Sequence, residues 1–318
     1  MKVVAPGALG LGIQLPVQAQ SRTFAGPWEA EAGPTELADI AQAADRAGLL
    51  YVAVCDHVAV PRPQAEHMGT TWYDTVATLG YLAGITKTVR LLSHVYVPAY
   101  RHPLLTASAF ATLDVLSGGR VILGVGAGHL EGEFAALGVD FGGRGARTDE
   151  AIGAVSEALT HEFPAVEGPT WQFSEAGVGP RPIQSPRPPI WVGGSSPRAL
   201  RRVAELGDGW LPQGTPLREL PDAINTIHRL REKAGRAGDP LDLGANGPWV
   251  HVGETDRELG RGVVSGDPAK IVDVLSRYTN LGISHVQIGV PARSSAEWVD
   301  QLEAIGREVI PHLSGEDR

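Results

Sequence analysis

The sequence predicts a single (β/α)8 TIM barrel, of the α/β class, over residues 1–318. Eight short runs rich in β-branched and apolar residues alternate with longer segments of helical spacing, as in folds built on a parallel sheet. Several of these runs are apolar on both faces, as strands buried in a parallel sheet must be. The length of 318 residues exceeds the roughly 250 residues typical of this barrel. A doubly wound open sheet is the alternative.

The predicted strands fall into a well-defined group and a weaker group. Five are well defined, namely LGIQL (11–15), YVAVC (51–55), VRLLSHVYV (89–97), RVILGVG (120–126) and PIWVG (189–193). Three weaker runs complete the set, namely GWLP (209–212), WVHVG (249–253) and SHVQIG (284–289). In a barrel, catalytic side chains belong at the C-terminal ends of such strands.

Helical segments separate the strands and follow the last one. Their ranges are 34–47, 104–116, 148–161, 197–206, 217–234, 268–281 and 295–313. The first stops at Gly48 and the second at Gly118-Gly119, as expected for helix C-termini.

Two segments are longer than ordinary loops. The first, 163–188, is rich in proline and glycine, and the second is 254–267. In a barrel such insertions usually cap the active-site end, so we expect both at the C-terminal mouth. No linker separates two parts of the chain, which indicates one domain.

Composition excludes several classes of protein. Lys+Arg 27 against Asp+Glu 36 gives a net charge of −9, and no run of basic residues occurs. Nucleic-acid binding needs a concentrated positive face, so no nucleic-acid partner is expected. The single cysteine, Cys55, excludes an internal disulfide and a Cys-based zinc site. We therefore expect a cytoplasmic protein without a metal site.

The N-terminal region superficially suggests a signal peptide, because nineteen uncharged residues lie between Lys2 and Arg22. Prolines and glycines interrupt any helix there, and glutamines dilute its apolar character. We interpret Leu11–Leu15 as a buried strand instead. No other uncharged run reaches the roughly 18 residues of a membrane helix, so no membrane partner is expected.

Histidines lie at or near the ends of three predicted strands. His57 follows the second strand, His94 lies in the third and His129 follows the fourth. Asp56 precedes His57, and a carboxylate beside an imidazole can orient the ring or help to move a proton. Equally, Asp56 can cap the following loop while His57 is an ordinary loop residue. Four tryptophans, namely Trp28, Trp72, Trp191 and Trp210, can line a pocket, although the last two lie inside strands and suit the core or a wall better.

The fifth strand is followed by Gly193-Gly194-Ser195-Ser196-Pro197. Two glycines let the backbone approach a ligand, Ser196 can cap a helix and Pro197 suits the first helical position. Free N–H groups at such a helix start favour a phosphate. A tight strand-to-helix turn needs the same residues and is the alternative interpretation.

The glycine-rich run 124–129 is similar to a dinucleotide-binding fingerprint, but His129 replaces its third glycine and the run follows the fourth strand. A Rossmann interpretation is therefore weak. Walker A, nucleophile-elbow and zinc-protease motifs are absent from the sequence.

Four segments carry a family resemblance. They are LGIQLP (11–16), AADRAGLLYVAVCDHV (43–58), the stretch from VRLLSHVYV to GARTDEAI (89–152) and RPIQSPRPPIWVGGSSPRALRRVAELGDGWLP (181–212). With them the chain resembles the bacterial luciferase-like monooxygenase superfamily, and most closely its actinobacterial oxidoreductases that depend on the deazaflavin coenzyme F-420. The motifs are highly specific for the family and less so for the cofactor, because relatives that use FMN share much of this frame.

The resemblance implies where coenzyme F-420 binds. Asp56-His57 match the pair that lies against its ring, and Ala127-Gly128 match the loop beside its ribityl chain. Ser93-His94 match the place of a non-prolyl cis peptide bond that bulges behind the ring. Gly193-Gly194-Ser195, extended by Ser196, match the loop that holds the phosphate.

One departure bears on the substrate. The F-420-dependent glucose-6-phosphate dehydrogenases of this fold have a glutamate, a tryptophan and a second glutamate where this chain has Gln18, Pro61 and His129. The resemblance therefore does not extend to sugar-phosphate oxidation, and the substrate is left open.

The function implied is hydride transfer between C5 of the deazaflavin and a small organic substrate, with His57 as the catalytic acid–base and His129 as the competing candidate. The alternative is an FMN-dependent monooxygenase that receives reduced flavin from a separate reductase. A third possibility is a flavin-binding barrel without turnover. The family also implies a homodimer formed through helices such as 104–116.

Overall fold

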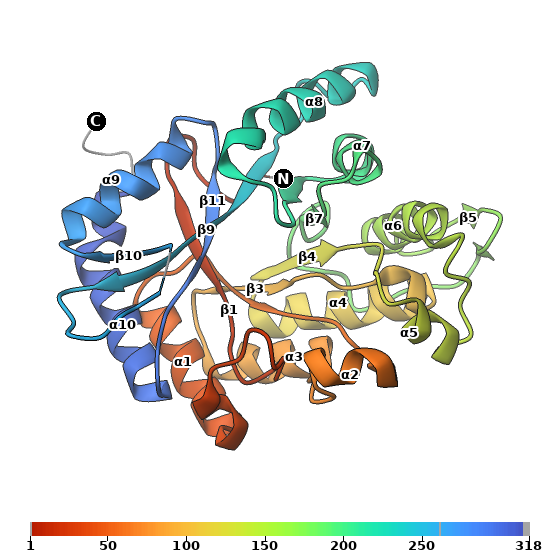
Figure 1. Ribbon diagram of the computed structural model, residues 1–318. Coiled ribbons are helices and arrows are strands. Elements are labelled where there is room, and N and C mark those ends of the chain that lie inside the picture. Colours follow the sequence, from red (N-terminus) through yellow and green to blue (C-terminus); the bar gives the residue numbers. More distant parts are fainter. Residues whose placement is uncertain (1, 261, 314–318) are drawn as a thin grey trace.

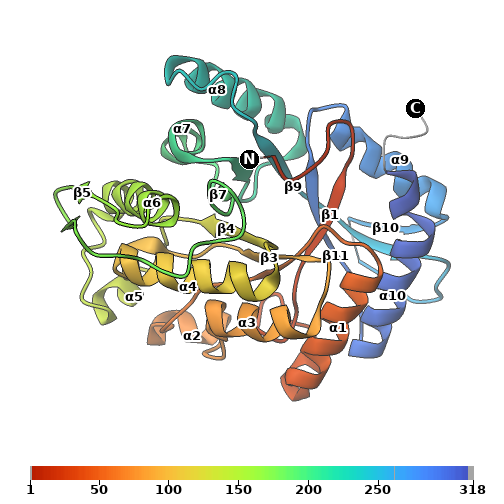
Figure 2. The same ribbon diagram turned by 180° about the vertical axis from the view of Figure 1, so that it is seen from behind.

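The computed structural model describes residues 2–260 and 262–313, and it confirms the (β/α)8 barrel. Among these residues, eight parallel strands close into a ring because β11 pairs with β1 and β8 pairs with β9. In ring order they are β1 (Gly10–Gln14), β2 (Tyr51–Val54), β3 (Arg90–Ser93), β4 (Val121–Val125), β7 (Ile190–Gly193), β8 (Gly209–Leu211), β9 (Asp242–Val252) and β11 (His285–Gly289). Figures 1 and 2 show helices around the outside of the strands.

Each barrel strand is followed by a helix, and the seven predicted helices are confirmed in the described chain. The eight are α1 (Pro34–Arg46), α3 (Thr75–Ile85), α4 (Pro103–Ser117), α6 (Arg144–Thr160), α7 (Pro197–Leu206), α8 (Leu220–Lys233), α9 (Pro268–Thr279) and α10 (Ser295–Glu308). Helix α3 lies outside the predicted set, because its sequence is apolar nearly all round and shows no helical period. The sequence feature that could have indicated this helix is Asp74 at its N-cap, whose side chain accepts a hydrogen bond from the Ala77 N–H at 2.8 Å.

Shorter elements fill the connections. They are η1 (Pro27–Glu31), α2 (Arg62–Met68), η2 (Pro98–Tyr100), α5 (Glu131–Ala136), β5 (Val166–Glu167), β6 (Gln172–Phe173), η3 (Leu217–Glu219), β10 (Val263–Gly266) and η4 (Ile310–His312). Helices α2 and α5 lie in the loops that follow β2 and β4, so both belong to the mouth of the barrel.

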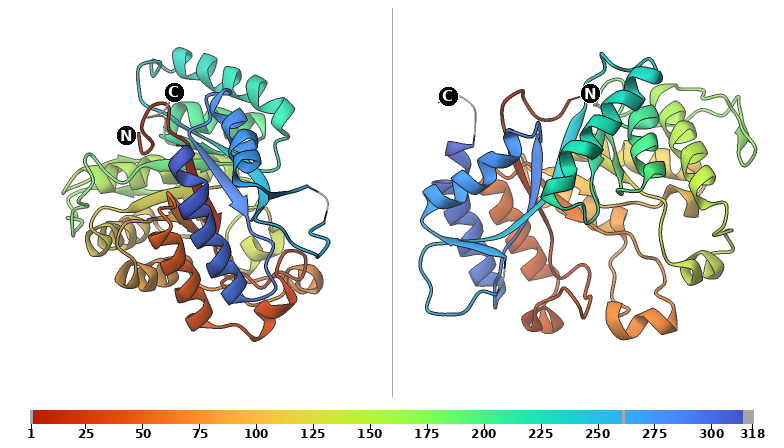
Figure 3. Two further views of the ribbon diagram at one scale, coloured as in Figure 1. Left: turned by 90° about the vertical axis from the view of Figure 1, so that its left-hand side faces the viewer. Right: turned by 45° about the horizontal axis from the view of Figure 1, so that its top comes forward.

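The seventh barrel strand begins earlier than predicted. The first part of β9, from Asp242 to Asn246, pairs with β8 and β11 inside the ring. The predicted run 249–253 matches the outer part of β9, which pairs with β10. The predicted start of this strand, at residue 249, was therefore wrong. The inner part includes an aspartate, a glycine and an asparagine, which do not indicate a strand. Figure 3 shows the loop after β9 projecting from the side of the molecule.

The two insertions differ in position. Residues 254–267 connect β9 to α9, so they follow the C-terminal end of a strand as expected. Residues 163–188 connect α6 to β7 and therefore start and finish at the opposite end of the barrel. The β5–β6 hairpin nevertheless reaches back toward the mouth, since the Trp171 N–H donates to Glu150 in the second turn of α6 at 2.9 Å.

Apolar side chains fill the barrel itself. The interior cluster consists of Tyr51, Ala53, Leu92, Ile122, Trp191 and Leu211. A larger apolar layer lies between the strands and the surrounding helices. The barrel is thus a packed core, and the loops at its C-terminal end lie above a solid floor.

Candidate active site

Two loops bring the predicted catalytic histidines together at the mouth. His57 follows β2 and His129 follows β4, and their ring centroids are 5.6 Å apart in a T-shaped contact. Trp72, between α2 and α3, packs against His57 with 4.4 Å between the ring centroids. The His57 side chain is 14 % exposed, so it is enclosed on most sides while part of it still meets solvent.

Glu133 on α5 holds His57 in place, although no pattern in the sequence singles it out. Its Oε2 lies 2.9 Å from His57 Nδ1 and accepts a hydrogen bond from the Tyr100 hydroxyl at 3.0 Å. Its Oε1 accepts hydrogen bonds from the N–H groups of Val58 and Ala59 at 2.6 and 3.1 Å. The Glu133 side chain is fully buried. The sequence feature that could have drawn attention to it is its position in the loop after β4.

These contacts determine the charges in the cluster. Burial alone would raise the pKa of Glu133, but hydrogen bonds from His57 and two backbone N–H groups hold that pKa below its usual value. Burial and the neighbouring His57 lower the pKa of His129, so this imidazole is neutral at neutral pH. Burial and the Glu133 charge raise the pKa of Tyr100, whose hydroxyl therefore keeps its proton.

Asp56 forms a buried ion pair with Arg101. The two Asp56 oxygens accept hydrogen bonds from the guanidinium at 2.7 and 2.8 Å. Oδ2 also accepts from the Val97 N–H at 2.8 Å, and the Thr75 hydroxyl lies 3.2 Å from Oδ1. The carboxylate thus ties the end of β2 to the segment after β3. Its contact with a cofactor stays a prediction.

The cis peptide bond lies one residue later than expected. The placement at Ser93-His94 was wrong, since the non-prolyl cis bond joins His94 to Val95. The His94 N–H still donates to the Val54 carbonyl at 2.7 Å, so the backbone leaves the β2–β3 ladder only after His94. The buried Ser93 hydroxyl bonds the N–H and the carbonyl of Gly124 at 3.0 and 2.9 Å, which anchors the strand below this bond.

Val95 packs where β3, β4 and β7 end, and two glycines make room for it. A Cβ at Gly126 would lie 2.4 Å from Val95 Cγ2, and one at Gly193 would lie 2.7 Å from Val95 Cγ1. Both distances are shorter than carbon contacts allow. Glycine at positions 126 and 193 therefore lets the ends of β4 and β7 approach Val95 closely.

Helix α7 begins as its sequence predicts. The Ser196 side chain caps it by accepting from the Ala199 N–H at 3.2 Å, and Gly194 has φ of +106°. The Ser195 hydroxyl bonds the carbonyl and the N–H of Gln213, beyond β8, at 3.2 and 2.9 Å. Because α7 follows β7, its N-terminus lies at the mouth, where the first-turn N–H groups suit a phosphate.

The loop after β4 contributes Ala127 and Gly128. Ala127 is half-buried, and the Gly128 carbonyl accepts a hydrogen bond from Arg144 Nε at 3.3 Å. This part of the mouth therefore presents mainly backbone, which fits the predicted place of a ribityl chain.

Buried histidines lie inside the strand ring. The ring nitrogens of His94 are buried, and the Gln287 side chain is a polar group beside them. Burial lowers the pKa of His94 to about 4 and that of His285 to about 3. The His285 ring stacks on Trp191 with 4.1 Å between the centroids. Both imidazoles are neutral at neutral pH.

The departures from the sugar-phosphate dehydrogenase pattern have structural places. Gln18 is fully buried, donates to the Leu15 carbonyl at 3.1 Å and accepts from the Cys55 N–H at 3.2 Å. Its amide joins the loops after β1 and β2. Pro61 is the N-cap residue of α2. Burial raises the pKa of Cys55 to about 12, so the thiol stays protonated.

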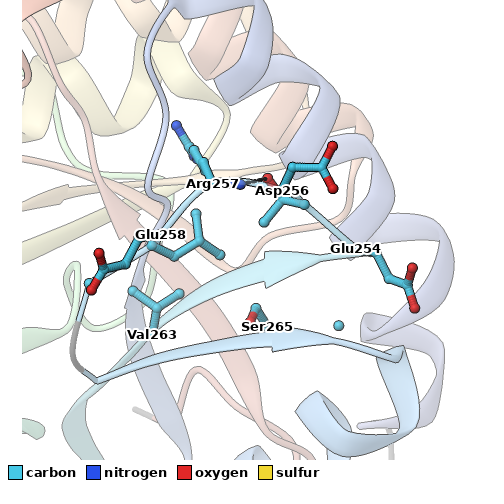
Figure 4. A pocket seen from close by; sticks show the side chains of 11 residues that line it. Glu254, Asp256, Arg257, Glu258, Val263 and Ser265 are labelled. Atoms are coloured by element: carbon cyan, nitrogen blue, oxygen red, sulfur yellow. Dashed lines mark hydrogen bonds between the residues drawn. The ribbon is translucent and has the colours of Figure 1, made fainter.

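A surface cavity of about 430 Å³ lies between the loop after β9 and strand β10 (Figure 4). Arg257 donates from its Nη2 to the Pro291 carbonyl and pairs with Glu297 at 2.9 Å. His57, His129 and Trp72 do not line this cavity. Within the described chain, no group of three or more His, Cys, Asp or Glu side chains is placed to hold a metal ion.

Two relatives match nearly the whole chain. The 5,10-methylenetetrahydromethanopterin reductase of Methanopyrus kandleri is 25% identical over 88% of this chain and 95% of its own length. The coenzyme F-420-dependent glucose-6-phosphate dehydrogenase of Microbacterium testaceum is 28% identical over 88% of this chain and 94% of its own length.

Solved structures share the barrel. A monooxygenase from Streptomyces bottropensis has a TM-score of 0.78 at 22% identity, covering 96% of this chain and 100% of its own. The coenzyme F-420-dependent tetrahydromethanopterin reductase of Methanopyrus kandleri has a TM-score of 0.75 at 22% identity, with the same coverage. The family model for luciferase-like monooxygenases matches residues 11–287. The chain belongs to the luciferase-like monooxygenase family.

Proposed function

We propose that this chain is a coenzyme F-420-dependent oxidoreductase that transfers a hydride between the deazaflavin and a small organic substrate. The observation that carries the proposal is the contact of His57 with both His129 and Trp72 at the mouth of the barrel. Support comes from relatives over nearly the full chain length whose names state dependence on coenzyme F-420.

Several parts of the mouth would hold the cofactor. The turn Gly193–Ser196 and the N-terminus of α7 would bind its phosphate, because their N–H groups and the helix dipole favour an anion. Ala127 and Gly128 would lie along the ribityl chain, and the segment from Ser93 to Val95 would support the ring. When bound, the deazaflavin supplies C5 as the site that accepts or donates a hydride.

His57 handles the proton that accompanies the hydride. Oxidation of an alcohol must remove the O–H proton, and reduction of a carbonyl must supply one. An imidazole is suited to both tasks near neutral pH. His129, 5.6 Å away between ring centroids, is the second candidate and would contact the substrate or complete the proton path.

Sugar-phosphate oxidation does not fit this mouth. The Gln18 amide is occupied by bonds to Leu15 and Cys55, and His129 replaces an acidic residue. Asp56 and Glu133, the carboxylates beside His57, are already bonded within the protein. The substrate class that fits best is a small neutral alcohol or carbonyl compound.

The test is to titrate the purified protein separately with coenzyme F-420 and with FMN and to follow the fluorescence of each. Tighter binding of F-420, followed by substrate-dependent change in its visible absorbance with small alcohols or ketones, is the expected result. Tight binding of FMN without detectable binding of F-420 would overturn the proposal in favour of a monooxygenase that needs a flavin reductase as partner.

Location stays a prediction. In residues 2–260 and 262–313, no helix combines the length and the apolar character needed to cross a bilayer. We propose the cytoplasm as the site of action.

A further inference from the structure

Four hydrogen-bond donors converge on the Glu133 carboxylate, and they come from two segments of the mouth. The loop after β2 supplies His57 Nδ1 and the N–H groups of Val58 and Ala59. The turn η2, which precedes α4, supplies the Tyr100 hydroxyl. All four distances lie between 2.6 and 3.1 Å, and the carboxylate is fully buried.

This arrangement decides which nitrogen of His57 carries the proton. An ionised carboxylate accepts hydrogen bonds and cannot donate one, so the proton between Glu133 and His57 belongs to Nδ1. In the neutral imidazole, Nε2 is then the unprotonated nitrogen. Tyr100 strengthens the arrangement, because its hydroxyl fills the second acceptor position on Oε2.

We propose that Glu133 is the positioning residue of His57, fixing it as the Nδ1–H tautomer so that Nε2 exchanges the proton with the substrate. In alcohol oxidation the C–H bond would break, and its electron pair would leave as the hydride that bound deazaflavin can accept. The O–H proton passes to Nε2, and a carbonyl compound remains. The reverse sequence reduces a carbonyl. The catalytic part of this inference rests on the function proposed above.

The decisive variant is Glu133→Gln, which keeps the size and shape of the side chain. Its amide oxygen can still accept from Val58 and Ala59, while its NH₂ group faces His57 Nδ1 and turns that nitrogen into an acceptor. The variant is therefore expected to fold and to hold His57 as the Nε2–H tautomer. The same exchange in a Ser-His-Asp triad lowers kcat about 10⁴-fold by producing the wrong tautomer.

The first readout needs neither cofactor nor substrate. Nitrogen-15 NMR of selectively labelled histidine, assigned with His57→Gln, is expected to show protonated Nδ1 in the wild type and protonated Nε2 in Glu133→Gln. Protonated Nε2 in the neutral wild-type ring would overturn the inference, even if the variant failed to fold.

The second readout is turnover with coenzyme F-420 and the alcohol or ketone that the wild type uses best. Glu133→Gln is expected to lower kcat by about 10² to 10⁴ while F-420 affinity stays within a few-fold. Wild-type kcat in a variant with the inverted tautomer would refute the positioning role. Absence of F-420 binding by the wild type would refute the proposed function instead and leave the NMR result standing.

Two controls separate positioning from general damage. Glu131→Gln changes an exposed carboxylate on the same helix and is expected to leave both readouts unchanged. Tyr100→Phe removes one donor to Oε2 but keeps the carboxylate, so the Nδ1–H tautomer is expected to persist.

Discussion

Asp56 and Arg101 face each other in a buried, two-pronged ion pair, with N–O distances of 2.7 and 2.8 Å. The pair joins the second residue after β2 to the residue after η2, so it braces the segment that carries Tyr100 against the loop that carries His57. Arg101 also lies over the Tyr96 ring at 4.3 Å. The ion pair therefore links two segments of the mouth that are distant in sequence.

Removing one partner of this pair should cost much of the stability of the protein. Arg101→Leu leaves Asp56 buried without its counter-charge, and we expect a loss of about 3–5 kcal/mol in the free energy of unfolding. Arg46→Leu is the matched control, because its ion pair with Glu303 is exposed and should be worth at most about 1 kcal/mol. Urea denaturation of both variants measures the difference, and similar losses would contradict the argument.

The role of His57 predicts a specific kinetic pattern. His57→Ala should leave coenzyme F-420 affinity within a few-fold and slow turnover by about 10² to 10⁴. His129→Ala should act more on substrate binding or on a second proton step. Fluorescence titration and steady-state kinetics distinguish the two variants. If His57→Ala were near wild type while His129→Ala were inactive, the assigned roles would have to be exchanged.

The free energy of unfolding should decrease as the pH falls below about 6.5. Histidines in the unfolded chain take up protons from that pH downward, whereas folded His94 and His285 resist protonation until about pH 4 and 3. The unfolded state therefore binds more protons, and each histidine costs about 1.4 kcal/mol per pH unit across this window.

Replacing one of these histidines should flatten that dependence. His285→Phe, which keeps an aromatic ring against Trp191, is expected to lose its share of the slope between pH 6.5 and 4 in urea titrations. His228→Gln changes an exposed histidine and should keep the full slope. An unchanged slope in His285→Phe would show that His285 does not resist protonation.

Two Gly→Ala exchanges should change the stability in opposite directions, because Gly126 lies against Val95 whereas Gly153 has open space around it. Gly126→Ala places a Cβ 2.4 Å from Val95, and overpacking of this kind costs about 1–3 kcal/mol. Gly153→Ala, at an exposed position of helix α6 with open space around it, should stabilise by about 0.5–1 kcal/mol through helix propensity. Thermal unfolding of the two proteins compares them directly, and a neutral Gly126→Ala would contradict the packing.

We also propose a homodimer formed through the α3–α4 side of the barrel. Leu105 and Leu116 on α4 are 68% and 69% exposed, and Tyr81 on neighbouring α3 is 45% exposed. The double variant Leu105→Lys/Leu116→Lys should be monomeric by light scattering, whereas Leu217→Lys, at an exposed leucine in η3, should remain dimeric. A monomeric wild type at micromolar concentration would end the proposal.

Regular patterns made most of the barrel predictable. Strands β2 and β4 show as runs of buried apolar residues because both faces of a parallel sheet are covered. Helix α3 was not predicted because its sequence lacks an amphipathic period. The inner part of β9 was not predicted because it lacks β-branched residues. The loop residues His57 and His129 could be placed at one end because parallel strands share a direction.

The contacts that organise the site were not predictable in the same way. Glu133 and His57 are 76 positions apart, and nothing in either segment specifies that their side chains meet. The cis bond after His94 depends likewise on where the β2–β3 ladder ends in three dimensions. Such pairings arise from the packing of loops, which have no period that a single sequence can reveal.

The lone cysteine offers an experimental handle on all of these variants. Thiol-specific reagents attack the thiolate, and the raised pKa of the half-buried Cys55, which directly follows β2, keeps its thiol protonated. Maleimide labelling should therefore be slow in the folded protein and rapid once β2 separates from its neighbours. Because the sequence has no second thiol, the rate of labelling directly reports opening of the barrel beside His57.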